Sequence, residues 1–395
     1  MKRERIRDLV AFFVIAVVIA GTVVSSRLLL PRHIDSPVAE VPVEAPITSS
    51  EPDLGSLDED IGSVMVVSWR GTRITPALVS LLEDDLVGGV LLFASNFNGA
   101  GGLRALTAHL QALGASACLD HPILVMIDEE GGRVNRVSGG FAPPSQLVAG
   151  AGGPAHVRAL ERASGAGLRE LGIGLNLAPV ADVRTNSRDE VIGDRSFGSN
   201  PAVVGPLVAA AVDGLHDGGV GATLKHFPGL GGAAGDPHFA IPTDPESEQQ
   251  WEQTQLPAFQ AGIAAGVDAV MTTAVYVPGL GAGKTPALFY APVIDRLRTQ
   301  MAFGGAIITD SLSMGGIGVR YSLPQAAVLA LAAGNDMLLL GNGDLGYERA
   351  ALAAVREAVL SGRIDRAKLH ASAMRVNHMR DRWGERVAHC HSRAA

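Results

Sequence analysis

The sequence has no excess of positive charge and few aromatic residues. Lysine and arginine number 32 against 40 aspartates and glutamates, so the formal net charge is −8. This balance argues against a polyanionic partner, and no nucleic-acid footprint is present. Aromatic residues make up 5% of the chain, whereas 47% of residues are hydrophobic and 48 are glycine. Such a composition is typical of buried aliphatic strands joined by tight glycine turns.

Cysteine is nearly absent. The two cysteines, Cys118 and Cys390, can pair in an oxidising compartment, but their separation along the chain neither requires nor excludes a disulfide. No cysteine directly follows the apolar run near the N-terminus, so that segment has no residue to which a lipid could be attached.

The N-terminus combines a basic flank with an apolar run. Four basic residues within positions 2–7 precede the apolar residues 9–24, and three leucines at 28–30 extend the run. This pattern predicts a signal anchor or transmembrane segment over residues 1–30, with the rest of the protein outside the cytoplasm. No Ala-x-Ala cleavage site is present, although a removed signal peptide, and hence a secreted protein, remains the alternative. Residues 31–58 predict a proline-rich linker and residues 386–395 a polar tail.

Short apolar strands alternate with helical patterns through the body of the chain. The predicted strands are Ser63–Ser68, Gly89–Phe93, Ile123–Asp128, Gly174–Val180, Val220–His226, Asp268–Thr273, Ala306–Asp310 and Asp336–Leu340. The predicted helices are Thr75–Leu86, Leu103–Leu113, His156–Leu171, Pro201–Asp217, Glu248–Ala265, Ala291–Met301, Pro324–Ala333, Tyr347–Leu360 and Asp365–Arg382. Eight strand–helix units in one α/β domain predict a (β/α)8 TIM barrel.

A doubly wound open sheet is the alternative fold. It would place a glycine-rich phosphate turn after the first strand, but residues 69–73 lack the G-x-G-x-x-G pattern. No nucleotide or redox cofactor motif occurs elsewhere, and no cofactor is expected.

Polar residues gather where five of the predicted strands end. They are Asp128 and Arg136 after the third, Asp182 and Arg195 after the fourth, Lys225 and His226 on the fifth, Thr273 on the sixth, and Asp310 on the seventh. Taken singly, a carboxylate at a strand end is better explained as a helix N-cap, and for Asp310 the cap and a functional role are equally good explanations. Five charged or hydroxyl-bearing strand ends together favour an active site, because a barrel collects its catalytic residues at this face.

A glycine-rich loop follows the fifth strand and carries Asp236 and His238 two residues apart. A carboxylate beside an imidazole fixes which ring nitrogen carries the proton, and such a pair can act as a general acid and base. A turn capped by Asp236 beside a surface histidine is the alternative. A metal site made of His226, Asp236 and His238 is a weaker alternative, because the Lys225 cation lies beside it in the sequence.

Four motifs together resemble the bacterial family 3 glycoside hydrolases, and most closely their single-domain β-N-acetylhexosaminidases. The motifs are Asp128-x-Glu-Gly-Gly-Arg-Val-x-Arg136, Ile192-Gly-x-Arg-Ser-Phe197, Lys225-His-Phe-Pro-Gly followed by Asp236-x-His238, and Thr309-Asp-x-Leu-x-Met314. The resemblance implies a catalytic domain over residues 59–385.

The resemblance also implies a role for each site residue. Asp310 would be the nucleophile of a retaining glycosidase, and His238 the general acid and base, oriented by Asp236. The positions expected to hold the sugar hydroxyls and the N-acetyl group are Asp128, Arg136, Arg195, Lys225 and His226.

Four positions depart from the family pattern. The family usually has histidine at Leu230, serine at Pro237, histidine at Ala274 and aspartate at Ser311. These changes leave the catalytic pair intact but remove polar groups around the loop, so altered efficiency or specificity is expected.

The expected function is a membrane-tethered, monomeric exo-β-N-acetylglucosaminidase acting on cell-wall fragments or related glycoconjugates. A phosphorylase on the same fold is one alternative, because a histidine donor repels phosphate less than a carboxylate would. A degenerate, non-catalytic glycan-binding barrel is the other.

Overall fold

The computed structural model describes residues 54–84, 86–137, 142–189, 191–341 and 343–385. The chain divides into a unit that ends at Pro52 and a unit that begins at Asp53, and every described residue belongs to the second unit. The predicted anchor, the tail, most of the linker and Cys390 lie outside the described residues. Among the residues that are described, no helix is long and apolar enough to cross a membrane.

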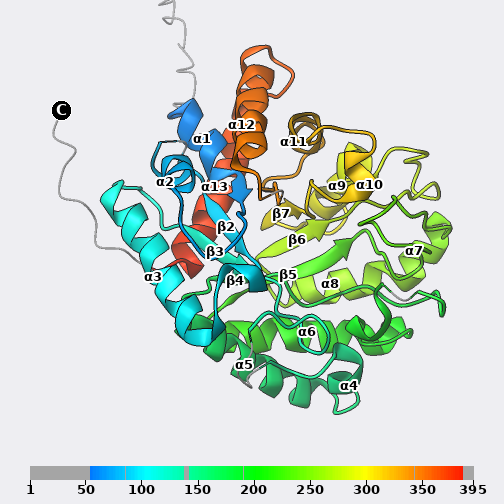
Figure 1. Ribbon diagram of the computed structural model, residues 1–395. Helices are drawn as coiled ribbons and strands as arrows, with labels where there is room; N and C mark the ends of the chain where they lie inside the picture. The colour runs from blue at the N-terminus through cyan, green and yellow to red at the C-terminus, as the bar shows by residue number, and fades with distance from the viewer. Residues whose placement is uncertain (1–53, 85, 138–141, 190, 342, 386–395) are drawn as a thin grey trace, which may run out of the picture. The chain divides into compact units, whose positions relative to one another are not determined.

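Eight parallel strands form the centre of the domain (Figure 1). They are β1 (Met65–Val67), β2 (Gly89–Leu92), β3 (Leu124–Ile127), β4 (Leu175–Asn176), β5 (Gly221–Phe227), β6 (Ala269–Thr272), β7 (Ala306–Thr309) and β8 (Leu338–Leu339). Strands β1 to β7 each pair with their sequence neighbours, and β8 pairs with β1. A parallel bridge between Ile308 and Met337 brings the two ends of the sheet together. The sheet therefore closes as a (β/α)8 barrel, as the alternation predicted, and the open-sheet alternative is wrong.

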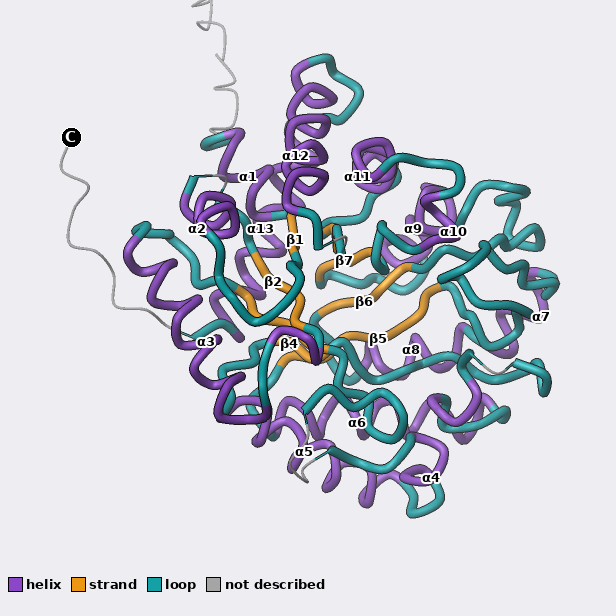
Figure 2. Tube along the Cα trace, in the orientation of Figure 1, coloured by secondary structure: helices purple, strands orange, loops and turns teal. Residues whose placement is uncertain are grey.

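Helices surround the strands (Figure 2). Those at the predicted positions are α2 (Pro76–Glu83), α3 (Gly99–Ser116), α5 (Pro154–Glu170), α6 (Pro201–Asp217), α7 (Glu248–Thr254), α8 (Leu256–Ala264), α9 (Ala291–Thr299), α11 (Leu323–Ala332), α12 (Leu345–Leu360) and α13 (Arg366–Trp383). The single helix predicted over Glu248–Ala265 is two helices. Pro257 near the start of α8 has no backbone N–H with which to continue the hydrogen bonding of α7.

The start of the domain also differs from the prediction. Residue Ser63, predicted to begin a strand, ends helix α1 (Leu57–Ser63), and the strand begins at Met65. The Ser56 side chain accepts a hydrogen bond from the backbone N–H of Glu59, which caps the helix within the range predicted as linker. Three consecutive acidic residues in the first turn of α1 suit the positive end of the helix dipole.

The interior of the barrel is filled and one end is covered. Alternate strand residues form an apolar cluster that includes Val66, Met126 and Ile308. Trp383 of α13 belongs to the same cluster, and a side chain added at Gly174 or Gly221 would meet Trp383 within 3 Å. Because Gly174 and Gly221 lie at the beginnings of β4 and β5, α13 covers the amino end of the barrel. The carboxyl ends of the strands are left for the site.

Candidate active site

A buried lysine joins two acidic residues at the carboxyl ends of the strands. Lys225 Nζ of β5 lies 2.7 Å from Asp128 Oδ1 and 2.6 Å from Glu130 Oε1, in the segment after β3. Burial lowers the pKa of Lys225, but the two carboxylates outweigh burial and hold the pKa above its usual value. Lys225 is therefore charged, and it holds Asp128 through one of the two carboxylate oxygens.

Arg195 completes this charge cluster from the loop between β4 and α6. It ends the short 3-10 helix η2 (Gly193–Arg195) and donates from Nε and Nη2 to the two oxygens of Glu130, at 2.7 and 2.8 Å. Burial raises the pKa of Glu130, but Lys225 and Arg195 lower it far more, so its net pKa lies well below the usual value. Glu130 is therefore ionised, and its two oxygens bind Arg195 and Lys225, which orients both cations.

A second carboxylate orients His226. Asp182, which is fully buried, accepts from the His226 ring at Nδ1 at 2.7 Å and from the backbone N–H of Leu230 at 2.7 Å. His226 Nε2 lies 3.3 Å from Arg195 Nη2, and an arginine can only donate. Nε2 therefore accepts, which assigns the neutral imidazole with its proton on Nδ1.

Asp310 follows β7 and has both carboxylate oxygens oriented by donors. Thr273 Oγ1, just after β6, donates to Asp310 Oδ2 at 2.8 Å, and the Ser311 backbone N–H donates to Oδ1 at 2.7 Å. The Asp310 backbone N–H also bonds to the Thr272 carbonyl at 2.7 Å. These bonds set the direction of the carboxylate.

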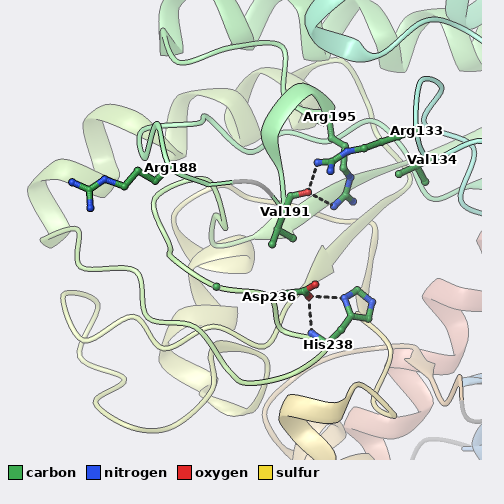
Figure 3. Close-up of a pocket in the computed structure, with 8 residues that line it drawn as sticks. Arg133, Val134, Arg188, Val191, Arg195, Asp236 and His238 are labelled. Atoms are coloured by element: carbon green, nitrogen blue, oxygen red, sulfur yellow. Dashed lines mark hydrogen bonds and ion pairs between the residues drawn. The ribbon is translucent and has the colours of Figure 1, made fainter.

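The Asp236–His238 pair lies on the predicted loop and lines a cavity of about 550 Å³. His238 Nδ1 is 2.8 Å from Asp236 Oδ1, which leaves Nε2 for chemistry. The His238 side chain is 69% exposed. Figure 3 shows the pair in the cavity together with Arg195 and Arg133, which also line the cavity. The same loop touches the segment after Asp310, because the Gly316 N–H donates to the Pro237 carbonyl at 3.2 Å.

Arg136 differs from the other predicted sugar-binding residues because no ion pair ties it down among the described residues. Its backbone N–H bonds to Glu129 Oε2 at 2.8 Å, and its Nε is buried without a hydrogen-bond partner in the described part of the chain. Burial raises the pKa of Glu129 to about 7. Arg136 therefore retains donors that a ligand could use.

Each of the four departures from the family pattern is accommodated by local contacts. Leu230 and Ala274 are buried in apolar clusters, where they fill space. Ser311 exchanges a hydrogen bond with Ser313 at 2.9 Å, and Ser313 in turn donates to the Gly341 carbonyl. Pro237 is buried against Gly316.

Three residues that orient the site were given no role by the sequence. Glu130 lies within the first motif, Asp182 and Thr273 follow β4 and β6, and each orients a predicted residue. Their positions at strand ends were a usable signal, but their partners are distant in sequence: 95 positions separate Glu130 from Lys225 and 44 separate Asp182 from His226.

No group of three or more His, Cys, Asp or Glu side chains suited to a metal ion occurs in the described ranges. Of the three residues considered as metal ligands, His238 and Asp236 are paired with each other, whereas His226 is paired with Asp182.

The glycosyl hydrolase family 3 N-terminal domain matches residues 56–379. The chain belongs to this family. The match confirms the resemblance carried by the four motifs, and it places the chain among the glycoside hydrolases. A β-hexosaminidase of Methylobacillus flagellatus is 36% identical over 281 residues, which span 69% of this chain and 78% of that protein.

Solved family 3 structures share the fold. A β-N-acetylglucosaminidase from Paenibacillus is 33% identical with a TM-score of 0.80, and the match covers 86% of this chain but 65% of that one. A family 3 hydrolase from Mycobacterium smegmatis is 32% identical with a TM-score of 0.73, covering 82% of this chain and 96% of that one. The chain thus spans about two thirds of the Paenibacillus protein and nearly all of the mycobacterial one.

Proposed function

We propose that this family 3 hydrolase is a retaining exo-β-N-acetylglucosaminidase. The observation that carries the proposal is the arrangement of Asp310 and His238. Asp310 follows β7, and both of its carboxylate oxygens accept hydrogen bonds. His238 is paired with Asp236 on a loop that contacts the segment after Asp310. The names of the relatives support the sugar: the relative from Methylobacillus is a β-hexosaminidase and the Paenibacillus structure a β-N-acetylglucosaminidase.

In the first step, an Asp310 oxygen attacks the anomeric carbon while the bond to the leaving oxygen breaks. His238 Nε2 gives its proton to that oxygen, and a glycosyl ester of Asp310 forms. The negative charge of Asp236 stabilises the imidazolium from which the proton comes.

In the second step, neutral His238 takes a proton from a water molecule. The water oxygen bonds to the anomeric carbon, and the Asp310 carboxylate leaves. Two inversions at the same carbon retain its configuration. Because water enters where the aglycone left, the exposed position of His238 suits both steps.

The charged cluster would hold the sugar. Asp128, Lys225, His226 and Arg195 are connected by hydrogen bonds and ion pairs through Glu130, and Arg195 lines the cavity. Arg136 adds Nε, which has no hydrogen-bond partner among the described residues. Each member is held by another protein group before substrate arrives, so little reorganisation would accompany binding.

We further propose that the enzyme acts outside the cytoplasmic membrane on peptidoglycan-derived fragments. The basic and apolar N-terminal residues support this location. Fractionation of cells expressing the full chain, followed by protease treatment of intact cells, checks it: a domain that stays protected from protease contradicts the proposal.

The chemical proposal is tested with the full chain and an aryl β-N-acetylglucosaminide. Hydrolysis is expected for the wild type and is lost in Asp310→Ala. A slow fluorinated substrate should add one glycosyl mass to the peptide that contains Asp310. An active enzyme that labels elsewhere would overturn the assignment of the nucleophile, whereas an inactive wild type would overturn the activity.

A phosphorylase is the second candidate, and the arginines around His238 favour it. Arg133, Arg188 and Arg195 line the cavity, and their charges suit an approaching phosphate. Adding inorganic phosphate to the assay discriminates the two: accumulation of N-acetylglucosamine 1-phosphate in place of the free sugar identifies the phosphorylase.

A further inference from the structure

Two glycines after β7 contact the backbone of the loop that carries His238. They are Gly315 and Gly316, the first residues of α10 (Gly315–Gly318). A Cβ added at Gly315 would lie 2.3 Å from the His238 carbonyl oxygen, and one at Gly316 would lie 2.6 Å from the Pro237 carbonyl oxygen. Real Cβ atoms do not approach backbone atoms so closely, so any side chain here would displace the loop.

The contact includes a hydrogen bond and extends along the loop. The Gly316 N–H donates to the Pro237 carbonyl at 3.2 Å. A Cβ at Gly316 would also lie 2.9 Å from backbone atoms of Ala240 and Ile241. Gly316 therefore touches the loop on both sides of His238.

The segment that carries these glycines is fixed relative to Asp310. Leu312, which is buried, donates its backbone N–H to the Leu339 carbonyl of β8 at 2.8 Å. Ser313 Oγ donates to the Gly341 carbonyl at 2.7 Å. The four residues between Asp310 and Gly315 are thus anchored to the barrel through Leu312 and Ser313 rather than free to follow the loop.

The loop is also shaped to fit this surface. The Asp236 carbonyl accepts from the backbone N–H groups of Phe239 and Ala240, at 3.0 and 3.1 Å, which forms a compact turn around His238. Pro237 is buried at the contact. Its ring restricts the backbone of the turn, which limits the conformations that the loop can adopt against Gly316.

We propose that Gly315 and Gly316 are positioning residues: their missing side chains form a seat that sets the distance between the acid His238 and the nucleophile Asp310. The proposal rests on the proposed function for the roles of these two residues. The seat acts through backbone contact and touches no substrate.

The chain supplies a matched control. Gly318, in the same short helix, has no atom within 4 Å of an added Cβ. None of Gly315, Gly316 and Gly318 has a positive φ, so alanine strains the backbone at none of them. Gly316→Ala and Gly318→Ala therefore differ mainly in contact with the loop.

The experiment compares two substrates of the full-length enzyme. Dinitrophenyl β-N-acetylglucosaminide has a leaving group that needs no proton, whereas N,N′-diacetylchitobiose needs the acid. For Gly316→Ala we expect kcat/KM to fall about 10- to 100-fold on the disaccharide and less than about threefold on the aryl glycoside. Gly318→Ala should match the wild type on both. An equal loss on both substrates, or no loss, overturns the seat.

Hydrogen exchange gives a readout that does not depend on activity. In Gly316→Ala, and in Gly315→Ala if the first variant does not fold, amides of residues 234–241 should exchange faster than in Gly318→Ala, with the barrel strands unchanged. Unchanged protection of the loop refutes the seat even if the wild type has no glycosidase activity. If the wild type is inactive but the loop of Gly316→Ala exchanges faster, only the proposed function is refuted.

Discussion

Asp236 Oδ1 lies 2.8 Å from His238 Nδ1 and 2.9 Å from the His238 backbone nitrogen. One carboxylate oxygen therefore holds both the ring and the main chain of the residue that would protonate the substrate. Partial burial raises the pKa of Asp236, but the bonds to His238 lower it more, so its net pKa lies below the usual value. Asp236 is ionised through the neutral range and can stabilise a charged imidazole.

Asp236→Asn should lower kcat about 10- to 1,000-fold on N,N′-diacetylchitobiose, because the amide cannot stabilise the imidazolium. The loss in kcat/KM should be much smaller on the dinitrophenyl glycoside. Steady-state kinetics on both substrates measure it. Asp213→Asn, which changes an acid paired with exposed Arg158, is the control and should retain full activity. Equal rates for wild type and Asp236→Asn on the disaccharide would contradict the role of Asp236.

Thr273→Val should slow formation of the glycosyl ester about tenfold, because Asp310 Oδ2 loses the donor that orients it. Thr273→Ser keeps the hydroxyl and should recover most of the rate. Pre-steady-state measurement with the dinitrophenyl glycoside isolates this step. If serine is as poor as valine, then the methyl group rather than the hydroxyl of Thr273 matters.

Glu130→Gln should destabilise the domain by about 3 to 5 kcal/mol, because Lys225 and Arg195 would share one fewer buried negative charge. Denaturant unfolding measures the change. The control is Asp194→Asn, which breaks a pair with Arg133 in which both side chains are 46% exposed. That change should cost less than about 1 kcal/mol. If the two variants lose similar free energies of unfolding, then burial does not determine how much the ion pairs of Glu130 contribute to stability.

Glu161 of α5 makes stability depend on pH. Burial, followed by the nearby charge of Glu129, raises its pKa from 4.5 to about 8, and its Oε2 has no hydrogen-bond partner in the described residues. A carboxyl group with a raised pKa in the folded state binds more protons when folded. The contribution of protonated Glu161 to the free energy of unfolding is therefore fully present below about pH 4.5 and is lost as pH rises through about 8.

Glu161→Gln should accordingly be more stable than the wild type above about pH 8, by on the order of 2 kcal/mol, and close to it near pH 5. Unfolding curves across this range check the difference. Some pH dependence should remain in the variant, because burial also raises the pKa of Glu129 to about 7. A pH-independent difference between the two proteins would contradict the assignment.

The number and type of strands could be predicted because each one is a short apolar run between turns. All eight are present, although β4 and β8 contain only two residues each in regular pairing. The helix break near Pro257 and the capped α1 depend on local hydrogen bonds that hydrophobic periodicity does not report. Boundaries therefore differed where backbone donors, rather than apolar spacing, decided them.

The site could be predicted in composition but not in connectivity. The motifs placed Asp128, Lys225, His226 and Arg195 at neighbouring strand ends, and the structure connects all four. It did not follow from the motifs that Glu130 would bind both cations. Nor did it follow that Arg136 would stay outside the ion-pair cluster.

By itself, the sequence determined the barrel, the family and the residues available for chemistry, because alternating apolar runs and strand-end motifs are local properties of the chain. Only the tertiary structure decided which partners those residues have. Glu130 meets Lys225, and Gly316 meets Pro237, across many intervening residues. Such contacts depend on how strands and loops close around a common axis, and that closure depends on the packing of the whole domain.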